Sequence, residues 1–118
     1  MKKTFTALVL ALAAACGSSP GSPDTNQPPS LIIPLNGDSL VGPDVDFQWD
    51  AISGATRYYH QIDTDPSMQS PEETITQSPA LTLQPGTQGA FWWRVRASVT
   101  GQSSYTPWSE TWSFLFTP

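Results

Sequence analysis

The sequence predicts an all-β protein, a seven-stranded antiparallel sandwich of two sheets. Three observations predict this fold class. Apolar and polar residues alternate in short runs, turn-forming residues interrupt the chain about every 8 to 20 residues, and no stretch shows a sustained helical period. Twelve of the 13 aromatic residues lie between Phe47 and Phe116, so this region has the side chains to build a core.

Each strand follows from its own pattern. The clearest is the second, in which Val45, Phe47 and Trp49 alternate with acidic and amide residues and so predict one buried and one wet face. The polar fourth run predicts an edge strand. The predicted strands are residues 31–33, 45–50, 57–63, 72–77, 81–83, 91–97 and 111–116.

The N-terminus is predicted to be a targeting sequence rather than part of the fold. Two lysines precede an apolar run over residues 6–15, which is too short for a stable transmembrane helix, and the single Cys follows directly. The stretch from Leu12 to Gly17 resembles the lipobox of bacterial lipoproteins. The resemblance implies a signal peptide over residues 1–15 and lipid attachment at Cys16. An ordinary signal peptide and a buried N-terminal helix are the alternatives.

Residues 16–28 are predicted to be the lipidated Cys and a disordered tether of Ser, Gly and Pro, and residues 29–118 the domain. Loss of residues 1–15 removes both lysines, so three arginines face ten acids and the net charge falls from -5 to -7. Such a chain is not expected to bind nucleic acid. One Cys and one His exclude an internal disulfide and a multi-cysteine or multi-histidine metal centre, and we expect no cofactor.

Short motifs occur in one order along the predicted domain. They include Phe47-x-Trp49, Tyr58-x-x-Gln61-Ile62, Leu83-x-Pro85-Gly86-Thr87 and Phe91-x-Trp93-Arg94-Val95-Arg96-Ala97. Together they resemble a fibronectin type III domain of the bacterial kind, which implies an immunoglobulin-like sandwich. The sequence departs from that family at Phe91, which replaces the corner tyrosine, and at His60, where an aliphatic residue is usual.

Several residues raise the question of catalysis or metal binding. His60 has the parity of the core, and a neutral, partly buried and hydrogen-bonded imidazole is favoured over a catalytic base or a pH switch. Asp63 and Asp65 are expected to cap a turn, because two carboxylates followed by a proline do not supply the six or seven oxygens that calcium needs. No catalytic residue and no metal site are therefore predicted.

The candidate binding residues are aromatic and basic. In the sheet order that the resemblance implies, the strand of Tyr59 lies beside the strand of Trp92, Arg94 and Arg96, and all four have outward parity. They predict either an exposed contact patch or a self-satisfied ladder of arginines on tryptophan, and the ladder is favoured. The segment 108–113 (Trp-Ser-Glu-Thr-Trp-Ser) is similar to the W-S-x-W-S box of cytokine-receptor domains, in which such a ladder occurs.

Two loops form a second candidate surface. Residues 52–55 and 100–106 are expected at the same end of the sandwich, and Tyr105 lies in the second of them. The sequence thus predicts a non-catalytic lipoprotein of the bacterial cell envelope, most consistent with the outer membrane, that displays the domain for protein–protein or surface interaction. Carbohydrate adhesion through the exposed aromatics is the alternative, and an accessory role to a hydrolase is a third.

Overall fold

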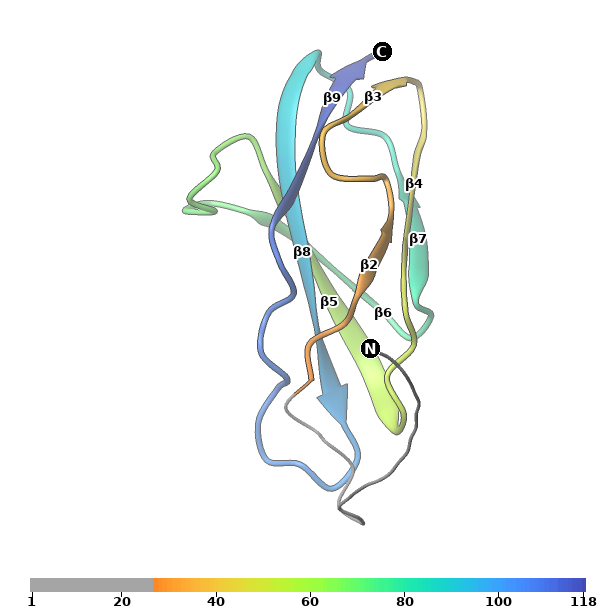
Figure 1. Cartoon of the computed structure of the whole chain (residues 1–118), viewed down its shortest axis with the longest axis vertical. Coiled ribbons are helices and arrows are strands. Elements are labelled where there is room, and N and C mark those ends of the chain that lie inside the picture. Colours follow the sequence, from red (N-terminus) through yellow and green to blue (C-terminus); the bar gives the residue numbers. More distant parts are fainter. Residues whose placement is uncertain (1–26) are drawn as a thin grey trace, which may run out of the picture.

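The computed structural model describes residues 27–118, which form two sheets packed face to face (Figure 1). The predicted all-β sandwich is confirmed, and no helix in this part of the chain could cross a membrane. The predicted signal peptide, Cys16 and nearly all of the tether lie outside the described residues. The three-stranded sheet has the antiparallel order β2 (Leu31–Ile33), β4 (Val45–Trp49), β7 (Ala80–Leu83). The five-stranded sheet has the order β3 (Asp38–Val41), β9 (Trp112–Thr117), β8 (Gly89–Val99), β5 (Ala55–Asp63), β6 (Glu72–Thr76).

The strand β3 is the element that sequence reasoning missed. It adds an eighth strand to residues 27–118 and pairs in parallel with β9, so that one pair in the sandwich is not antiparallel. Side-chain and main-chain bonds hold it there, since Asn36 Oδ1 accepts a hydrogen bond from the Ser113 amide at 2.9 Å and the Gly42 amide donates to the Thr117 carbonyl at 2.7 Å. The sandwich class is therefore as predicted, and the strand count is one higher.

The core lies between the two sheets and consists mainly of aromatic rings. Alternate residues of β4 are buried, as the sequence pattern predicts, and Phe47 meets Trp93 of β8 edge-on with ring centroids 4.9 Å apart. Phe114 from β9 packs on Phe47 in the same way at 5.9 Å. Such pairs add to the burial of apolar area, so the alternation in β4 and β8 fixes which face of each sheet turns inward.

The two loops predicted to share one end of the sandwich do so. The Thr100 amide donates a hydrogen bond to the Gly54 carbonyl at 2.9 Å, which joins the turn before β5 to the turn after β8. Figure 1 shows both turns at the lower end of the molecule, where the long loop that follows β8 begins. This loop returns along the edge of β8, beyond the residues that pair with β9, and positions the candidate site.

Candidate functional site

The outer face of the five-stranded sheet brings the predicted binding residues together. The register of β5 on β8 sets Tyr59 opposite Arg96, Gln61 opposite Arg94 and Asp63 opposite Trp92. The predicted adjacency of these two strands is confirmed. Because β8 alternates, its arginines turn outward while Trp93 and Val95 turn into the core.

A ladder of stacked side chains runs along this face. The guanidinium of Arg94 lies 4.3 Å from the centre of the Trp108 ring, and that of Arg96 lies 4.4 Å from the same ring. Arg96 also lies 4.0 Å from the ring centre of Tyr105 and 5.8 Å from that of Tyr59. We call these five residues the arginine–aromatic ladder. Its central ring is that of Trp108. The segment 108–113 indicates a ladder that contains this tryptophan, but Trp108 is not among the predicted binding residues.

Two hydroxyl groups fix the loop that carries Trp108. The Thr106 amide donates to the Ala97 carbonyl at 2.9 Å, and its Oγ1 accepts the Ala97 amide at 3.0 Å. Ser109 repeats this arrangement on Val95, with an amide-to-carbonyl bond of 2.8 Å and an amide-to-Oγ bond of 2.9 Å. Side-chain oxygens thus replace main-chain carbonyls along the edge of β8 and satisfy its buried amides. Trp108 lies between the two anchors and is held over the outer face.

Arg94 is held by a polar chain as well as by stacking. Its Nε and NH2 atoms donate to Gln61 Oε1 at 3.0 and 2.8 Å, and Gln61 Nε2 donates to Glu73 Oε2 of β6 at 3.2 Å. Partial burial and then the neighbouring charge of Arg96 lower the pKa of Arg94 from its ordinary value. Within residues 27–118 neither guanidinium forms an ion pair with a carboxylate, so the ladder neutralises none of the domain's acids.

The exposure of the candidate residues decides whether this face is an exposed contact patch or a self-satisfied ladder. Tyr59 is only 9% exposed, because Tyr105 covers it edge-on with ring centroids 5.0 Å apart, and Trp92 is half-buried. The exposed contact patch is therefore wrong at Tyr59, and the favoured alternative, a ladder of arginines stacked on tryptophan, is confirmed. Tyr105 itself is 47% exposed and is the open aromatic of the ladder. The face is a rigid, mostly self-satisfied surface rather than a flat aromatic platform.

His60 lies in the core and not at a surface. Its ring packs between Trp49 and Trp93 and meets Phe47 edge-on at 4.4 Å, and its exposed fraction is 0%. Neither ring nitrogen has a hydrogen-bond partner in the described part of the chain, so the expectation of a hydrogen-bonded imidazole is wrong. Burial lowers the pKa of His60 to about 4, and a contact with its own main chain opposes this shift only in part.

The acidic pair in the turn after β5 acts as predicted. Asp63 accepts the amides of Asp65 and Ser70 at 3.2 and 3.0 Å, and Asp65 accepts both the amide and the hydroxyl of Ser67. These bonds lower the pKa of the Asp65 carboxyl. No group of three potential metal ligands occurs in the part of the chain that the structure describes.

The comparison with solved structures decides the type of sandwich. The chain has the fibronectin type III fold. It is similar to a fibronectin type III-like protein from Clostridium thermocellum, with 20% identity over 80% of this chain and 97% of that one and a TM-score of 0.56. It is also similar to a fibronectin type III domain of the human collagen alpha-1(XX) chain, with 19% identity, 85% and 93% coverage and a TM-score of 0.56.

A part of a larger enzyme shows the same fold. The chain is similar to a region of a β-1,2-glucanase from Parabacteroides distasonis, with 18% identity over 78% of this chain, 14% of that enzyme and a TM-score of 0.54. No family model and no curated protein matches the chain. At these identities the likeness establishes the fibronectin type III fold alone.

Proposed function

We propose that this protein is a lipid-anchored component of the bacterial cell envelope that displays its fibronectin type III-fold domain for contact with another protein and catalyses no reaction. The sequence supports the lipid anchor, because two lysines and then an apolar run precede Cys16. Two or three acyl chains on such a residue hold a protein stably at a membrane, whereas a single chain does not. The outer membrane is the proposed location.

One observation supports the contact role, namely the rigid outer face of the five-stranded sheet. The ladder holds Arg94, Arg96 and Trp108 in fixed positions and leaves Tyr105 half-exposed beside them. Arginine and aromatic side chains dominate the energetics of protein interfaces, and preorganised groups lose little conformational entropy on binding. Sugar binding by stacking would need open flat rings; Tyr59 is buried and Trp92 half-buried, which leaves Tyr105 as the one open ring of the ladder.

Metabolic labelling with a palmitate analogue tests the anchor. The natural chain should be labelled, and the Cys16→Ser variant should lose the label completely. A Cys16→Ser variant that still takes up the label would refute lipid attachment at this residue.

Site-specific photo-crosslinking in intact cells tests the contact role. A crosslinking amino acid at Tyr105 should yield a defined adduct with a protein, whereas the same group at Gln48, which is exposed on the three-stranded sheet, should not. Identical adducts from both positions, or none from Tyr105, would contradict a contact surface on the ladder.

A further inference from the structure

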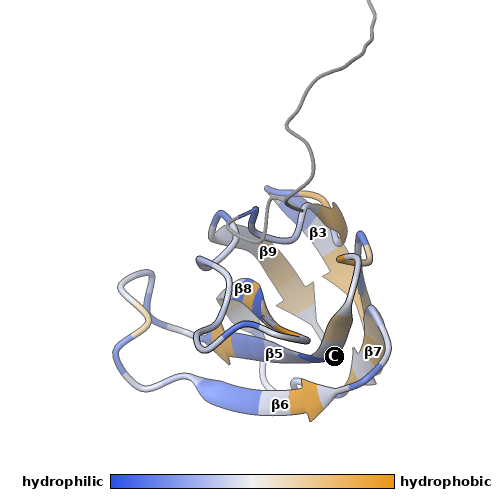
Figure 2. Ribbon diagram, turned by 90° about the horizontal axis from the view of Figure 1, so that it is seen from below, coloured by the Kyte–Doolittle hydropathy of each residue, from blue (hydrophilic) through white to orange (hydrophobic). Residues whose placement is uncertain are grey.

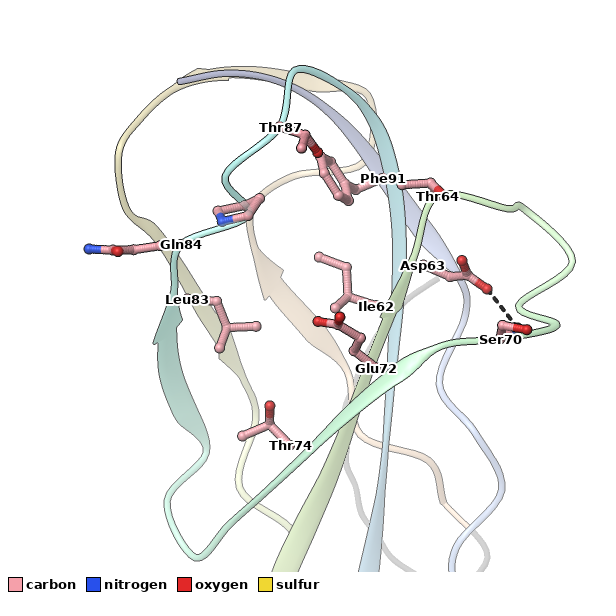
Figure 3. Close-up of a pocket in the computed structure, with 11 residues that line it drawn as sticks. Ile62, Asp63, Thr64, Ser70, Glu72, Thr74, Leu83, Gln84, Thr87 and Phe91 are labelled. Atoms are coloured by element: carbon pink, nitrogen blue, oxygen red, sulfur yellow. Dashed lines mark hydrogen bonds between the residues drawn. The ribbon is translucent and has the colours of Figure 1, made fainter.

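The sandwich is open along one side, between the outermost strands of the two sheets. β6 ends the five-stranded sheet and β7 ends the three-stranded sheet, so each has a main-chain edge without a strand partner in residues 27–118. A groove of about 440 Å³ lies between them. Figure 3 shows this groove, with Ile62 on its floor, Leu83 on one wall and Glu72 on the other. Its volume falls in the range of binding pockets.

The free edge of β7 has a defined hydrogen-bonding pattern. The Trp49 amide donates to the Pro79 carbonyl at 3.1 Å, and the register continues with Phe47 opposite Leu81. In an antiparallel pair, alternate residues bond to the partner strand and those between turn their amides and carbonyls the other way. Ala80 and Thr82 therefore present donors and acceptors to the open side. An extended chain laid there would be paired by β-augmentation.

The inner face of β6 is polar, which is unusual for a strand in a sandwich. Pairing with β5 sets Glu72 opposite Ile62 and Thr74 opposite His60. Ile62 and His60 are buried, so Glu72 and Thr74 lie on the inner face of β6. Figure 2 shows the hydrophilic first half of β6 at the margin of the molecule. Glu72 is exposed and Thr74 half-buried, and the half-buried Leu83 faces them across the groove. The groove thus combines an apolar floor with a polar wall.

The groove carries negative charge, which favours a basic side chain as its occupant. The Glu72 carboxylate makes no hydrogen bond and no ion pair within residues 27–118. Asp63, whose carboxylate accepts the Asp65 and Ser70 amides, also lines the groove. Arg94 and Arg96 are engaged with Trp108 on the outer face of the sheet, so neither supplies a counter-charge here. A lysine or arginine covers apolar surface with its stem while its charged end reaches a carboxylate.

We infer that the groove between β6 and β7 binds an extended segment of a partner protein, which pairs with the free edge of β7 and places a basic side chain over Ile62 against Glu72. This inference names the partner chemistry for the proposed contact role, at a surface other than the ladder. It does not depend on lipid attachment at Cys16.

Binding of a designed peptide to the isotope-labelled full chain in detergent tests the inference. The probe is a nine-residue acetylated peptide in which valine alternates with threonine and lysine replaces the central valine. Hydrogen exchange at the Ala80 and Thr82 amides should slow roughly tenfold when the peptide binds. A matched peptide with glutamate in place of lysine should bind about fivefold more weakly, as expected for a partly exposed ion pair.

Protein variants locate the site. Glu72→Gln should weaken binding of the lysine peptide about fivefold, whereas Asp50→Asn, which removes an exposed acid elsewhere, should leave it unchanged. Thr82→Pro removes an edge amide and should abolish binding, and Thr82→Val, which keeps the amide, should not. If Thr82→Pro fails to fold, N-methylation of the peptide amides that face β7 makes the same test.

Three outcomes would overturn the inference. They are unchanged exchange at Ala80 and Thr82, equal affinity for the lysine and glutamate peptides, and protection of these amides that grows with protein concentration without any peptide. The last outcome would make a second copy of this chain the occupant. Failure of the peptide test together with retained crosslinking at Tyr105 would leave the proposed contact role standing.

Discussion

Mild acid should destabilise the domain through His60. The imidazole is fully buried between two tryptophans, and neither nitrogen has a hydrogen-bond partner among residues 27–118. Its pKa is lowered by burial to about 4 in the folded protein, against an ordinary value of 6.5. Between these two values the unfolded chain binds the proton more readily than the folded one. The stabilisation is therefore complete above pH 6.5 and is lost as the pH falls toward 4.

The magnitude follows from the size of the shift. Each pKa unit corresponds to about 1.4 kcal/mol, so the whole shift amounts to roughly 3 kcal/mol. At pH 5 the unfolded state is almost fully protonated at this residue and the folded state is not. About 2 kcal/mol of the free energy of unfolding should thus be lost between pH 7.5 and pH 5. The lowered pKa of Asp65 contributes mainly below this range, because a carboxyl group titrates near pH 4.

Urea unfolding followed by tryptophan fluorescence measures this loss. The free energy of unfolding is determined at pH 7.5, 6.5, 5.5 and 5.0 for the natural chain and for His60→Leu. The variant lacks the buried imidazole, so its free energy of unfolding should be nearly independent of pH over this range. A natural chain without a pH slope, or a His60→Leu variant that keeps the full slope, would refute the assignment to His60.

Three substitutions test the ladder and the packing by the same unfolding assay. Trp108→Ala removes the ring between two guanidiniums and should cost about 2–3 kcal/mol, more than Trp92→Ala, since no arginine of residues 27–118 stacks on Trp92; equal costs would argue against the stacking contribution. Ser109→Ala leaves a buried amide of β8 without an acceptor and should cost about 1–3 kcal/mol, and an unchanged midpoint would contradict that bond. Gly42→Ala places a Cβ atom 2.5 Å from a phenylalanine ring of β9 and should cost about 1–3 kcal/mol. At Gly37 an added Cβ meets no atom within 4 Å, so Gly37→Ala is opposed only by the positive φ and should cost about 1 kcal/mol. A larger loss at Gly37 than at Gly42 would refute the steric argument.

The sequence predicts those strands whose two faces differ. β4 and β8 each have one face in the core and one outside, so their alternation is visible in the residues themselves. β3 has only four residues and lies at the edge of its sheet, with a half-buried Leu40 as its inward apolar residue. What holds it is a parallel pairing with β9, about 75 residues away in the chain, and no local pattern carries that information.

The same distinction applies to the candidate site. Parity correctly sets Arg94 and Arg96 on the outer face beside the strand of Tyr59, because register in a paired sheet follows from alternation. The exposure of Tyr59 does not follow from parity. It depends on the loop after β8, which returns over the sheet and lays Tyr105 on the ring. Hydroxyls at Thr106 and Ser109 fix that path, and their role is visible only in the folded chain.

The two candidate surfaces make different use of their polar groups, and this difference predicts how they respond to mutation. On the ladder, Arg94 is bonded to Gln61 and both guanidiniums stack on rings, although the buried Arg96 Nε has no hydrogen-bond partner within residues 27–118. Substitutions there should therefore lower stability first and affect binding through that loss. Along the groove, Glu72 and the free edge of β7 have no partner in residues 27–118, so Glu72→Gln should leave the free energy of unfolding nearly unchanged while it weakens a basic peptide. A Glu72→Gln variant that unfolds more easily than the natural chain would place Glu72 among the stabilising groups and remove the reason to assign it to recognition.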